Sequence, residues 1–197
     1  MLAPETVDEL AGIAHESRLR VHLDGARLFN AAVALGIGAE RVAREADSVS
    51  FCFSKGLGCP VGSVLCGSRE FIAQARKNRK MLGGGMRQVG VLGAAAIYAL
   101  ENNVGRLAED HANARALADG LRSIEGLAPN EPATNIVVVD VAANSLNRWL
   151  AALDRAGVLV APFGASRFRM VTHLDVNAAD VEEAIGRIEQ AAGALPA

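Results

Sequence analysis

Two short apolar runs, each ended by a polar residue, most constrain how this chain can fold. LRVHLD ends at Asp24, and DSVSFCF ends just before Lys55. Between them, ARLFNAAVALG has apolar residues at helical spacing and stops at Gly36, which predicts a helix. Strand, helix and strand in this order predict a βαβ unit with parallel strands. Because the C-terminal ends of such strands lie at one edge of the sheet, Asp24 and Lys55 are expected on the same side.

The position of Lys55 needs a physical explanation. It follows an apolar run and stands at a turn rich in glycine, SKGLGCPVG. A lysine at the end of a buried strand is costly to desolvate, so its side chain either escapes to solvent or serves chemistry. A desolvated amine can attack a carbonyl and form a Schiff base, which is how proteins anchor pyridoxal 5′-phosphate (PLP).

The same chemistry requires an acid. PLP withdraws electrons only while its pyridine nitrogen is protonated, and a carboxylate aimed at that nitrogen keeps it so. Asp24 is placed for this role, and Arg27 follows one helical turn later, where it can contact a phenolate oxygen or a substrate carboxylate. The alternatives remain open, since an aspartate before glycine also forms turns and an arginine in a first helical turn is commonly solvated.

The rest of the chain continues the alternation of helices and strands. We expect a helix over residues 4–17 with Pro4 in its first turn, a strand at GSVLCGS and a basic helix at REFIAQARKNRKML,. Three glycines then break the helical pattern, which resumes from Met86 to about Ile124 with a bend at NNVG,.

The last third has a different order of strands and helices. TNIVVVDV reads as a strand, SLNRWLAALDRAG as a helix, VLVAPF and RFRMVTHLDV as two further strands, and a final helix starts at Asn177,. This order predicts a small α+β layer. We therefore expect residues 1–105 to belong to a larger domain and residues 106–197 to form a small domain whose last four residues fray.

Composition excludes several classes of partner. With 51% hydrophobic residues, the 197-residue chain can bury a core, and its net charge of −2 gives no footprint for nucleic acid,. No apolar segment approaches the ~18 residues of a membrane span, and no signal-peptide pattern follows Met1,. The expected location is the cytoplasm.

Cysteine and histidine usage predicts no metal. Cys52, Cys59 and Cys66 are odd in number and seven residues apart, which fits neither a zinc site nor a disulfide framework, so we expect small buried apolar residues. The four histidines are scattered along the chain.

Four longer motifs, in this order, carry a resemblance to a known family. They are VHLDGARLFNAAVALG, SFCFSKGLGCPVGSVLCGS, KMLGGGMRQVGVLGAAAIYAL and RFRMVTHLDV. Together they closely resemble the low-specificity L-threonine aldolases, PLP enzymes of the β-eliminating lyase/threonine aldolase family, over essentially the whole chain. The resemblance implies an α/β fold: part of the large domain of the PLP-dependent transferase fold type I, with a mainly parallel sheet, and a small C-terminal α+β domain.

The resemblance also implies roles for particular residues. Lys55 is similar to the lysine that binds the cofactor, and Asp24 to the aspartate that pairs with its pyridinium nitrogen. Arg27 resembles the arginine that contacts the cofactor phenolate oxygen or the substrate carboxylate. Arg169, in RMVTHLDV, resembles the small-domain arginine that holds the substrate carboxylate, although a surface strand position would also explain it.

Weaker expectations concern five further residues. Arg87 and Lys80 flank the glycine triplet, where they could reach a cofactor phosphate or simply form a basic helix face. Ser54 either assists the cofactor through its hydroxyl or shapes the turn. We expect His173 to be structural and His22 to face the side of its strand opposite Asp24.

The implied reaction is retro-aldol cleavage of L-threonine or L-allo-threonine to glycine and acetaldehyde, in a homo-oligomer that is a dimer or a tetramer. Members of the family are longer, and the segment before the matching part supplies strands of the large domain, a phosphate-binding loop and an imidazole stacked on the cofactor. We therefore expect this chain to be inactive or weakly active without a separate N-terminal half. The alternatives are a non-catalytic, oligomerising remnant and a related PLP β-eliminating lyase acting on another amino acid.

Overall fold

The computed structural model describes residues 1–195 and divides the chain into two compact units, with the boundary between Leu107 and Ala108. The first unit spans Met1–Leu107, and the second begins at Ala108. The fraying expected for the last four residues falls partly on residues 196–197, which lie outside the described residues. Each unit has its own sheet and its own apolar clusters.

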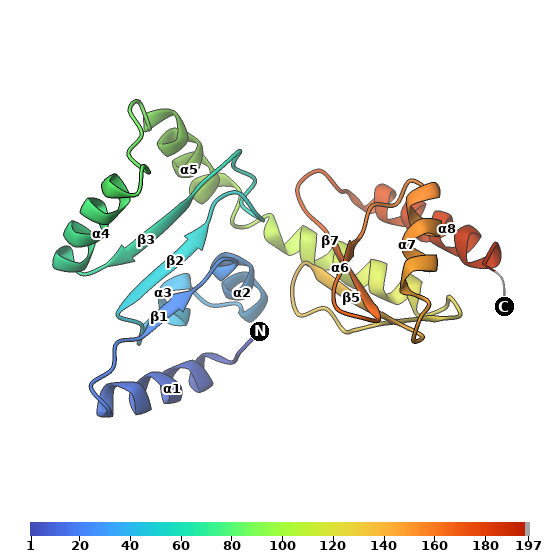
Figure 1. The fold of residues 1–197 in the computed structure, drawn as a ribbon, viewed down its shortest axis with the longest axis horizontal. Coiled ribbons are helices and arrows are strands. Elements are labelled where there is room, and N and C mark those ends of the chain that lie inside the picture. The colour runs from blue at the N-terminus through green and yellow to red at the C-terminus, as the bar shows by residue number, and fades with distance from the viewer. Residues whose placement is uncertain (196–197) are drawn as a thin grey trace. The chain divides into compact units, whose positions relative to one another are not determined.

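The sheet of the first unit has three strands in the order β1-β2-β3 (Figure 1). Strand β1 (His22–Asp24) pairs with β2 (Ser48–Cys52) in parallel, which confirms the predicted βαβ crossover. Strand β3 (Ser63–Gly67) pairs with β2 antiparallel, because a short glycine-rich connection can only turn the chain straight back. The α/β class is confirmed, with a mixed sheet in these residues.

The first strand is shorter than LRVHLD predicts. The backbone N–H of Val21 donates to the side chain of Asp47 instead of to a strand partner, at 2.8 Å. The carbonyl of Val21 in turn accepts from the N–H groups of Asp47 and Ser48. This junction aligns the start of β2 with β1 but leaves regular pairing to begin only at His22.

The helix ends of the first unit largely follow the predicted positions, although α2 begins at Leu28 instead of Ala26 and the helix predicted from Met86 begins only at Gly90. Pro4 opens α1 (Pro4–Glu16), Ser68 caps α4 (Arg69–Met81) by accepting from Phe71 N–H, and Gly36 ends α2 (Leu28–Leu35) at φ 67°,. The helical pattern after the glycine triplet forms α5 (Gly90–Asn102), which ends at the predicted bend. The four-residue helix α3 (Ala39–Val42) was not predicted.

The parallel pair β1–β2 has one apolar and one polar face. Leu23, Val49 and Phe51 pack against a buried cluster of Leu28, Ala32 and Val42. Because side chains alternate along a strand, the opposite face carries polar residues, namely His22, Asp24, Ser48 and Ser50. The predicted site residue Asp24 therefore lies on a polar face whose far side is fixed by a core.

Asp47 fastens the start of this sheet to α1. Its carboxylate accepts from Val21 N–H at 2.8 Å and from Arg20, and it lies 2.9 Å from Nε2 of His15. The backbone N–H of Val21, then Arg20 and His15, hold the pKa of this carboxyl well below its usual range,. The carboxylate therefore stabilises the fold in its ionised form.

We expect Asp47→Asn to lower the melting temperature at pH 7. A depressed carboxyl pKa gives stability that is fully present above the unfolded-state pKa, about 4, and that is lost as the pH falls toward the folded-state pKa. The difference between the two proteins should therefore shrink steadily below pH ~4. Glu9→Gln, an exposed acid of α1, serves as the control in thermal melts. A difference as large at pH 3 as at pH 7 would contradict this role.

The second unit is a four-stranded antiparallel sheet in the order β4-β5-β7-β6. Its strands are β4 (Leu127–Pro129), β5 (Ile136–Val141), β6 (Ala161–Pro162) and β7 (Arg167–Val171), and its helices are α6 (Leu107–Leu121), α7 (Leu146–Arg155) and α8 (Ala178–Gly193). The predicted strand at VLVAPF shrinks to β6, because Val158 N–H still bonds the end of α7 at Leu153. Strand β4 was not predicted, and Asn177 begins α8 with a capping box, as expected for its N-terminus,.

One continuous core holds the second unit together. Val137, Val139 and Phe168 are fully buried and contact Leu153 of α7 and Ile188 of α8 in the same cluster. The strict alternation of buried and open positions along β5 and β7 leaves the other face of the sheet to a mixture of apolar and charged side chains, Arg169 among them. Among residues 1–195, no helix is both long and apolar enough to cross a membrane.

Candidate functional site

Asp24 is the last residue of β1, and the residue after it locks its position. The N–H of Gly25 donates to the carbonyl of Ser50 at 2.8 Å. A Cβ at Gly25 would lie 3.1 Å from the same carbonyl oxygen, so the close approach favours glycine. The Asp24 side chain is exposed on the polar face and makes no hydrogen bond or ion pair within the described residues. The backbone at Asp24 is thus held in place, and its carboxylate is left available.

Lys55 stands on a turn that its neighbours make rigid. Phe53 N–H donates to Gly62, Cys59 N–H to Phe53, and Gly58 N–H to the carbonyl of Lys55 itself, at 2.9–3.0 Å. The turn thus closes on both sides of the lysine, while the Lys55 side chain is exposed and has no partner in the described chain.

Burial of the next two residues explains how an exposed lysine is held so firmly. Gly56 and Leu57 are both buried, and a Cβ at Gly56 would lie 2.8 Å from Oδ1 of Asn30 and 3.0 Å from Leu107. Asn103 Nδ2 also donates to the carbonyl of Leu57 at 2.7 Å. The turn is therefore anchored from inside, and the lysine points outward.

The turns that carry Asp24 and Lys55 adjoin one another. Phe51 packs edge to face on Phe29 and on Phe53, with ring centroids 5.1 and 5.2 Å apart, which ties α2 to the strand that leads to Lys55. The junction between the two turns is closely packed and leaves no space for a water molecule; it is formed by Ala26, Arg27, Leu28, Phe29, Asn30, Phe51, Cys52, Gly56 and Leu57.

The Lys55 side chain is exposed. The sequence left open whether it escapes to solvent or serves chemistry, and exposure is compatible with both. Gly56 and Leu57 enter the core in its place, so the amine remains accessible to a ligand. The parallel strand pairing that brings Asp24 and Lys55 to one edge is confirmed.

The prediction for His22 is wrong. His22 and Asp24 are two residues apart on β1, and residues at this spacing share a face of a strand. Both are exposed, whereas Leu23 between them packs into the apolar cluster. Sequence reasoning also missed Ser48 and Ser50, which lie beside His22 and Asp24 on the same face. The spacing of His22 and Asp24 and that of Ser48 and Ser50, two residues in each case, already indicated in the sequence that each pair shares a face of its strand.

Arg27 and Ser54 lie beside this edge. Arg27 is half-buried at the N-cap position of α2. The Ser54 hydroxyl is exposed and lies 3.5 Å from the carbonyl of Gly62, a long contact that supports the turn-shaping interpretation more than a role toward a ligand.

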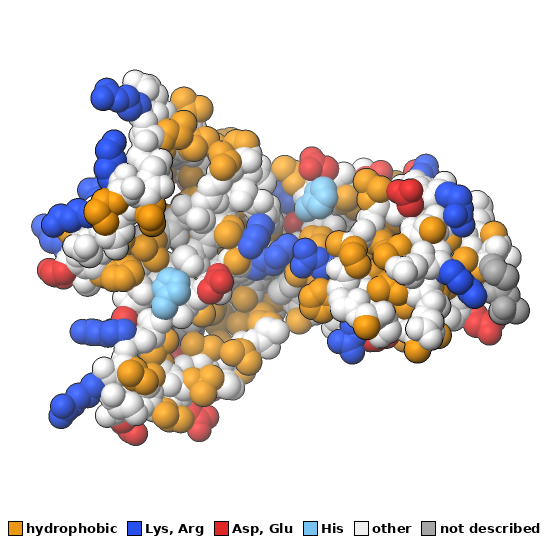
Figure 2. Space-filling view, viewed as in Figure 1, with side chains coloured by type: hydrophobic (Ala, Val, Ile, Leu, Met, Phe, Trp, Pro, Cys, Tyr) orange, Lys and Arg blue, Asp and Glu red, His pale blue; other side chains and the backbone are white. Residues whose placement is uncertain are grey.

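Arg87 and Lys80 lie on either side of the glycine triplet and are both exposed, with no partner in the described residues. Figure 2 shows Lys and Arg side chains gathered over α4 and the segment that follows it, which confirms the predicted basic face. These exposed cations are Arg69, Arg76, Lys77, Arg79, Lys80 and Arg87.

Arg169 belongs to the second unit, on the sheet face away from the helices. It lies between Val138 of β5 and Ala161 of β6 in the strand register. Its side chain is exposed and makes no hydrogen bond or ion pair in residues 1–195. A guanidinium without a protein partner beside small and apolar neighbours is available for an anion.

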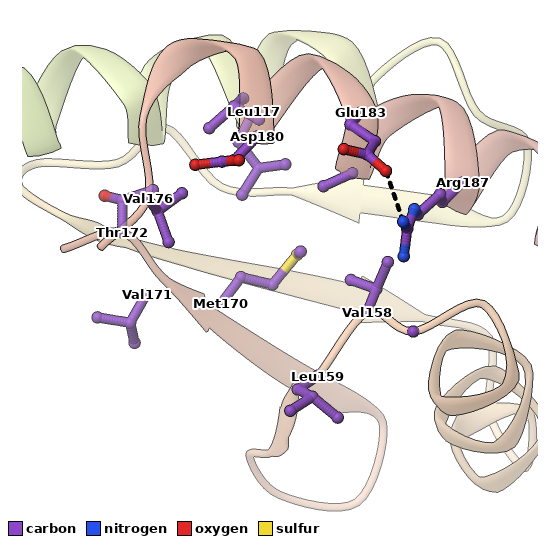
Figure 3. Close-up of a pocket in the computed structure, with 13 residues that line it drawn as sticks. Leu117, Val158, Leu159, Met170, Val171, Thr172, Val176, Asp180, Glu183 and Arg187 are labelled. Atoms are coloured by element: carbon purple, nitrogen blue, oxygen red, sulfur yellow. Dashed lines mark hydrogen bonds and ion pairs between the residues drawn. The ribbon is translucent and has the colours of Figure 1, made fainter. Parts of the chain in front are cut away.

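A separate cavity of about 280 Å³ lies in the second unit, on the other face of β7 (Figure 3). Leu117, Val158, Met170 and Val176 contribute apolar side chains to its lining. Its charged groups already have partners, because Arg187 pairs with Glu183 at 2.5 Å and the Asp180 side chain accepts from Asn177 N–H. This cavity contains none of the predicted site residues.

The cysteines are free thiols and are less buried than expected. Cys66 is exposed, and Cys52 and Cys59 are half-buried. Cys66 is exposed because β3 lies at the end of the sheet order and the apolar cluster does not extend over it. Burial raises the pKa of the Cys59 thiol,. Among residues 1–195 no group of three His, Cys, Asp or Glu side chains is arranged to hold a metal.

Comparison with known proteins places these residues in a family. The model of the family described as "Beta-eliminating lyase" matches residues 1–144. The low specificity L-threonine aldolase of Escherichia coli K12 is 44% identical over 184 residues, covering 93% of this chain and 54% of the relative. Low-specificity L-threonine aldolase 1 of Arabidopsis thaliana is 42% identical over 195 residues, covering 96% and 54%.

The fold has the same relatives. The structure of a threonine aldolase from Leishmania major superposes with a TM-score of 0.79 at 20% identity, covering 98% of this chain and 57% of the other. This chain thus spans about half the length of the relatives it matches. The family model and both sequence relatives agree, and the chain belongs to the beta-eliminating lyase family.

Proposed function

We propose that this chain serves PLP-dependent cleavage of L-threonine or L-allo-threonine to glycine and acetaldehyde. The observation that carries the proposal is the shared edge of β1 and β2, where Asp24 ends one strand and Lys55 follows the other. Neither side chain has a partner in the described residues. An unpaired amine and an unpaired acid at one strand edge suit a cofactor that needs both.

The residues present fit PLP. Asp24 lies on a polar face, its backbone is fixed by Gly25, and its carboxylate is accessible. Lys55 projects from a turn that its buried neighbours anchor. When bound, PLP supplies an electron sink for negative charge at the substrate α-carbon.

Each residue then has a defined task. In our proposal the Nζ of Lys55 attaches the cofactor, and the Asp24 carboxylate keeps a proton on the pyridine nitrogen. Arg27 orients the phenolate oxygen or the substrate carboxylate, and Arg169 binds that carboxylate. Arg87 contributes to anion binding, and Ser54 shapes the turn.

We further propose that this chain alone binds PLP weakly and releases little glycine. Both Lys55 and Asp24 are exposed, so water competes with the cofactor for each of them and screens their charges. A homo-oligomeric assembly belongs to the same proposal. The competing functions are a non-catalytic binding role and β-elimination on another amino acid.

The test is to incubate the purified chain with PLP and follow the visible absorption of the protein-bound cofactor and the release of glycine. We expect a saturable spectral change and little glycine from L-threonine or L-allo-threonine, with the E. coli relative as the positive control. A missing spectral change would reject PLP binding. Rapid glycine release by this chain would reject the proposed weakness, and turnover of a different amino acid would favour the alternative lyase.

A further inference from the structure

One face of the β1–β2 pair places four polar side chains side by side. They are His22, Asp24, Ser48 and Ser50. The register aligns His22 with Ser48 and Asp24 with Ser50. None of the roles proposed above uses His22 or either serine.

The His22 ring makes a hydrogen bond at each of its nitrogens. Nδ1 lies 2.9 Å from Oγ of Ser48, and Nε2 lies 3.3 Å from Oγ of Ser50. A serine hydroxyl can donate or accept, so both nitrogens of a neutral imidazole find a suitable partner. Two contacts at opposite sides of the ring fix its orientation along β2, although the side chain is exposed,.

Ser50 connects this ring to Asp24. Ser50 is the register partner of Asp24, on a strand about 4.8 Å away. The carbonyl of Ser50 also accepts from Gly25 N–H at 2.8 Å. Ser50 therefore contacts the ring through its side chain and holds the residue after Asp24 through its backbone. His22 lies two residues before Asp24 on the same face of β1, on the side of the strand away from the edge where Lys55 follows β2.

We propose that His22 is a positioning residue for Asp24. Its ring, anchored by Ser48 and Ser50, fixes the Ser50 hydroxyl and fills the polar face behind the carboxylate, so that Asp24 points toward the strand edge. The inference rests on the proposed function in one respect, namely that the Asp24 carboxylate there meets the pyridine nitrogen of PLP. His22 itself acts only through its neighbours.

The first experiment measures PLP affinity by titration of the visible absorption in a series of variants. We expect His22→Phe, which keeps an aromatic ring and removes both nitrogens, to weaken PLP binding about tenfold, because the ring loses both hydrogen bonds that hold it on the face that carries Asp24,. Ser50→Ala should weaken PLP binding as much as His22→Phe does, and Ser48→Ala should weaken it less. His22→Gln should bind PLP more tightly than His22→Phe does, and more tightly than His22→Asn, because only the longer amide reaches the Ser50 hydroxyl.

A second readout needs no cofactor. In the chain without PLP, the ¹⁵N NMR signals of the His22 ring should move in Asp24→Asn and stay unchanged in Glu9→Gln, with thermal melts showing that every variant folds. If wild type takes up no PLP, the proposed function fails and the NMR comparison alone decides the positioning role. His22 signals that ignore Asp24→Asn, or wild-type PLP affinity in His22→Phe, would overturn the inference.

Discussion

Lys55→Ala is expected to remove the visible absorption of protein-bound PLP and to reduce glycine release to the background without enzyme. The covalent attachment depends on one amine, and losing a nucleophile that forms a covalent link costs about three orders of magnitude in rate or more. Because Lys55 is exposed and has no protein partner, the substitution should leave the melting temperature close to that of wild type. Absorption spectra, a glycine assay and thermal melts give these three readouts.

Lys77→Ala is the matched control for this prediction. Lys77 is exposed on α4, so its amine is accessible to an aldehyde, as is that of Lys55. We expect this variant to keep the full PLP signal. A Lys55→Ala protein with the same spectrum as Lys77→Ala would remove Lys55 from the site.

Asp24→Asn is expected to weaken PLP binding by about tenfold to a hundredfold. The substitution keeps the size of the side chain and removes the negative charge that would hold the proton on the pyridine nitrogen, and a hydrogen bond to a charged group contributes roughly 1.5–3 kcal/mol. Activity should fall further than affinity, by roughly 10²–10³-fold, since the electron sink depends on that proton. The measurements are a PLP titration and glycine release at saturating PLP.

Asp24→Glu separates charge from geometry. It keeps the carboxylate but moves it one methylene farther from the backbone that Gly25 and Ser50 hold. We expect it to recover part of the affinity and little of the activity. Equal affinity in wild type and Asp24→Asn would show that this carboxylate does not meet the cofactor.

Much of the fold follows from local rules. Pro4, Gly36 and Asn177 mark helix ends in the sequence, and in the structure helices begin or end there. The parallel relation of β1 and β2 follows from their helical connection,. What was missed, β4 and α3, are elements of three and four residues, too short to show a period.

The position of the candidate site could be predicted from the sequence, but the exposure of Lys55 and the side chains around Asp24 could not. Motif order pointed to Asp24 and Lys55, and the structure gives them one strand edge. Exposure of Lys55 depends on Gly56 fitting against Asn30 and Leu107, a contact between segments far apart in the chain. The roles of His22, Ser48 and Ser50 became visible only once the register between the strands was known.

Chemical trapping tests the central claim most directly. The chain has three lysines, Lys55, Lys77 and Lys80, so borohydride reduction with PLP followed by peptide mass spectrometry can locate the attachment. We predict a phosphopyridoxyl group on Lys55 at limiting PLP, with the signal reduced in Asp24→Asn. Equal labelling of all three lysines, or labelling confined to the two on α4, would contradict the claim that Lys55 and Asp24 together form the cofactor site.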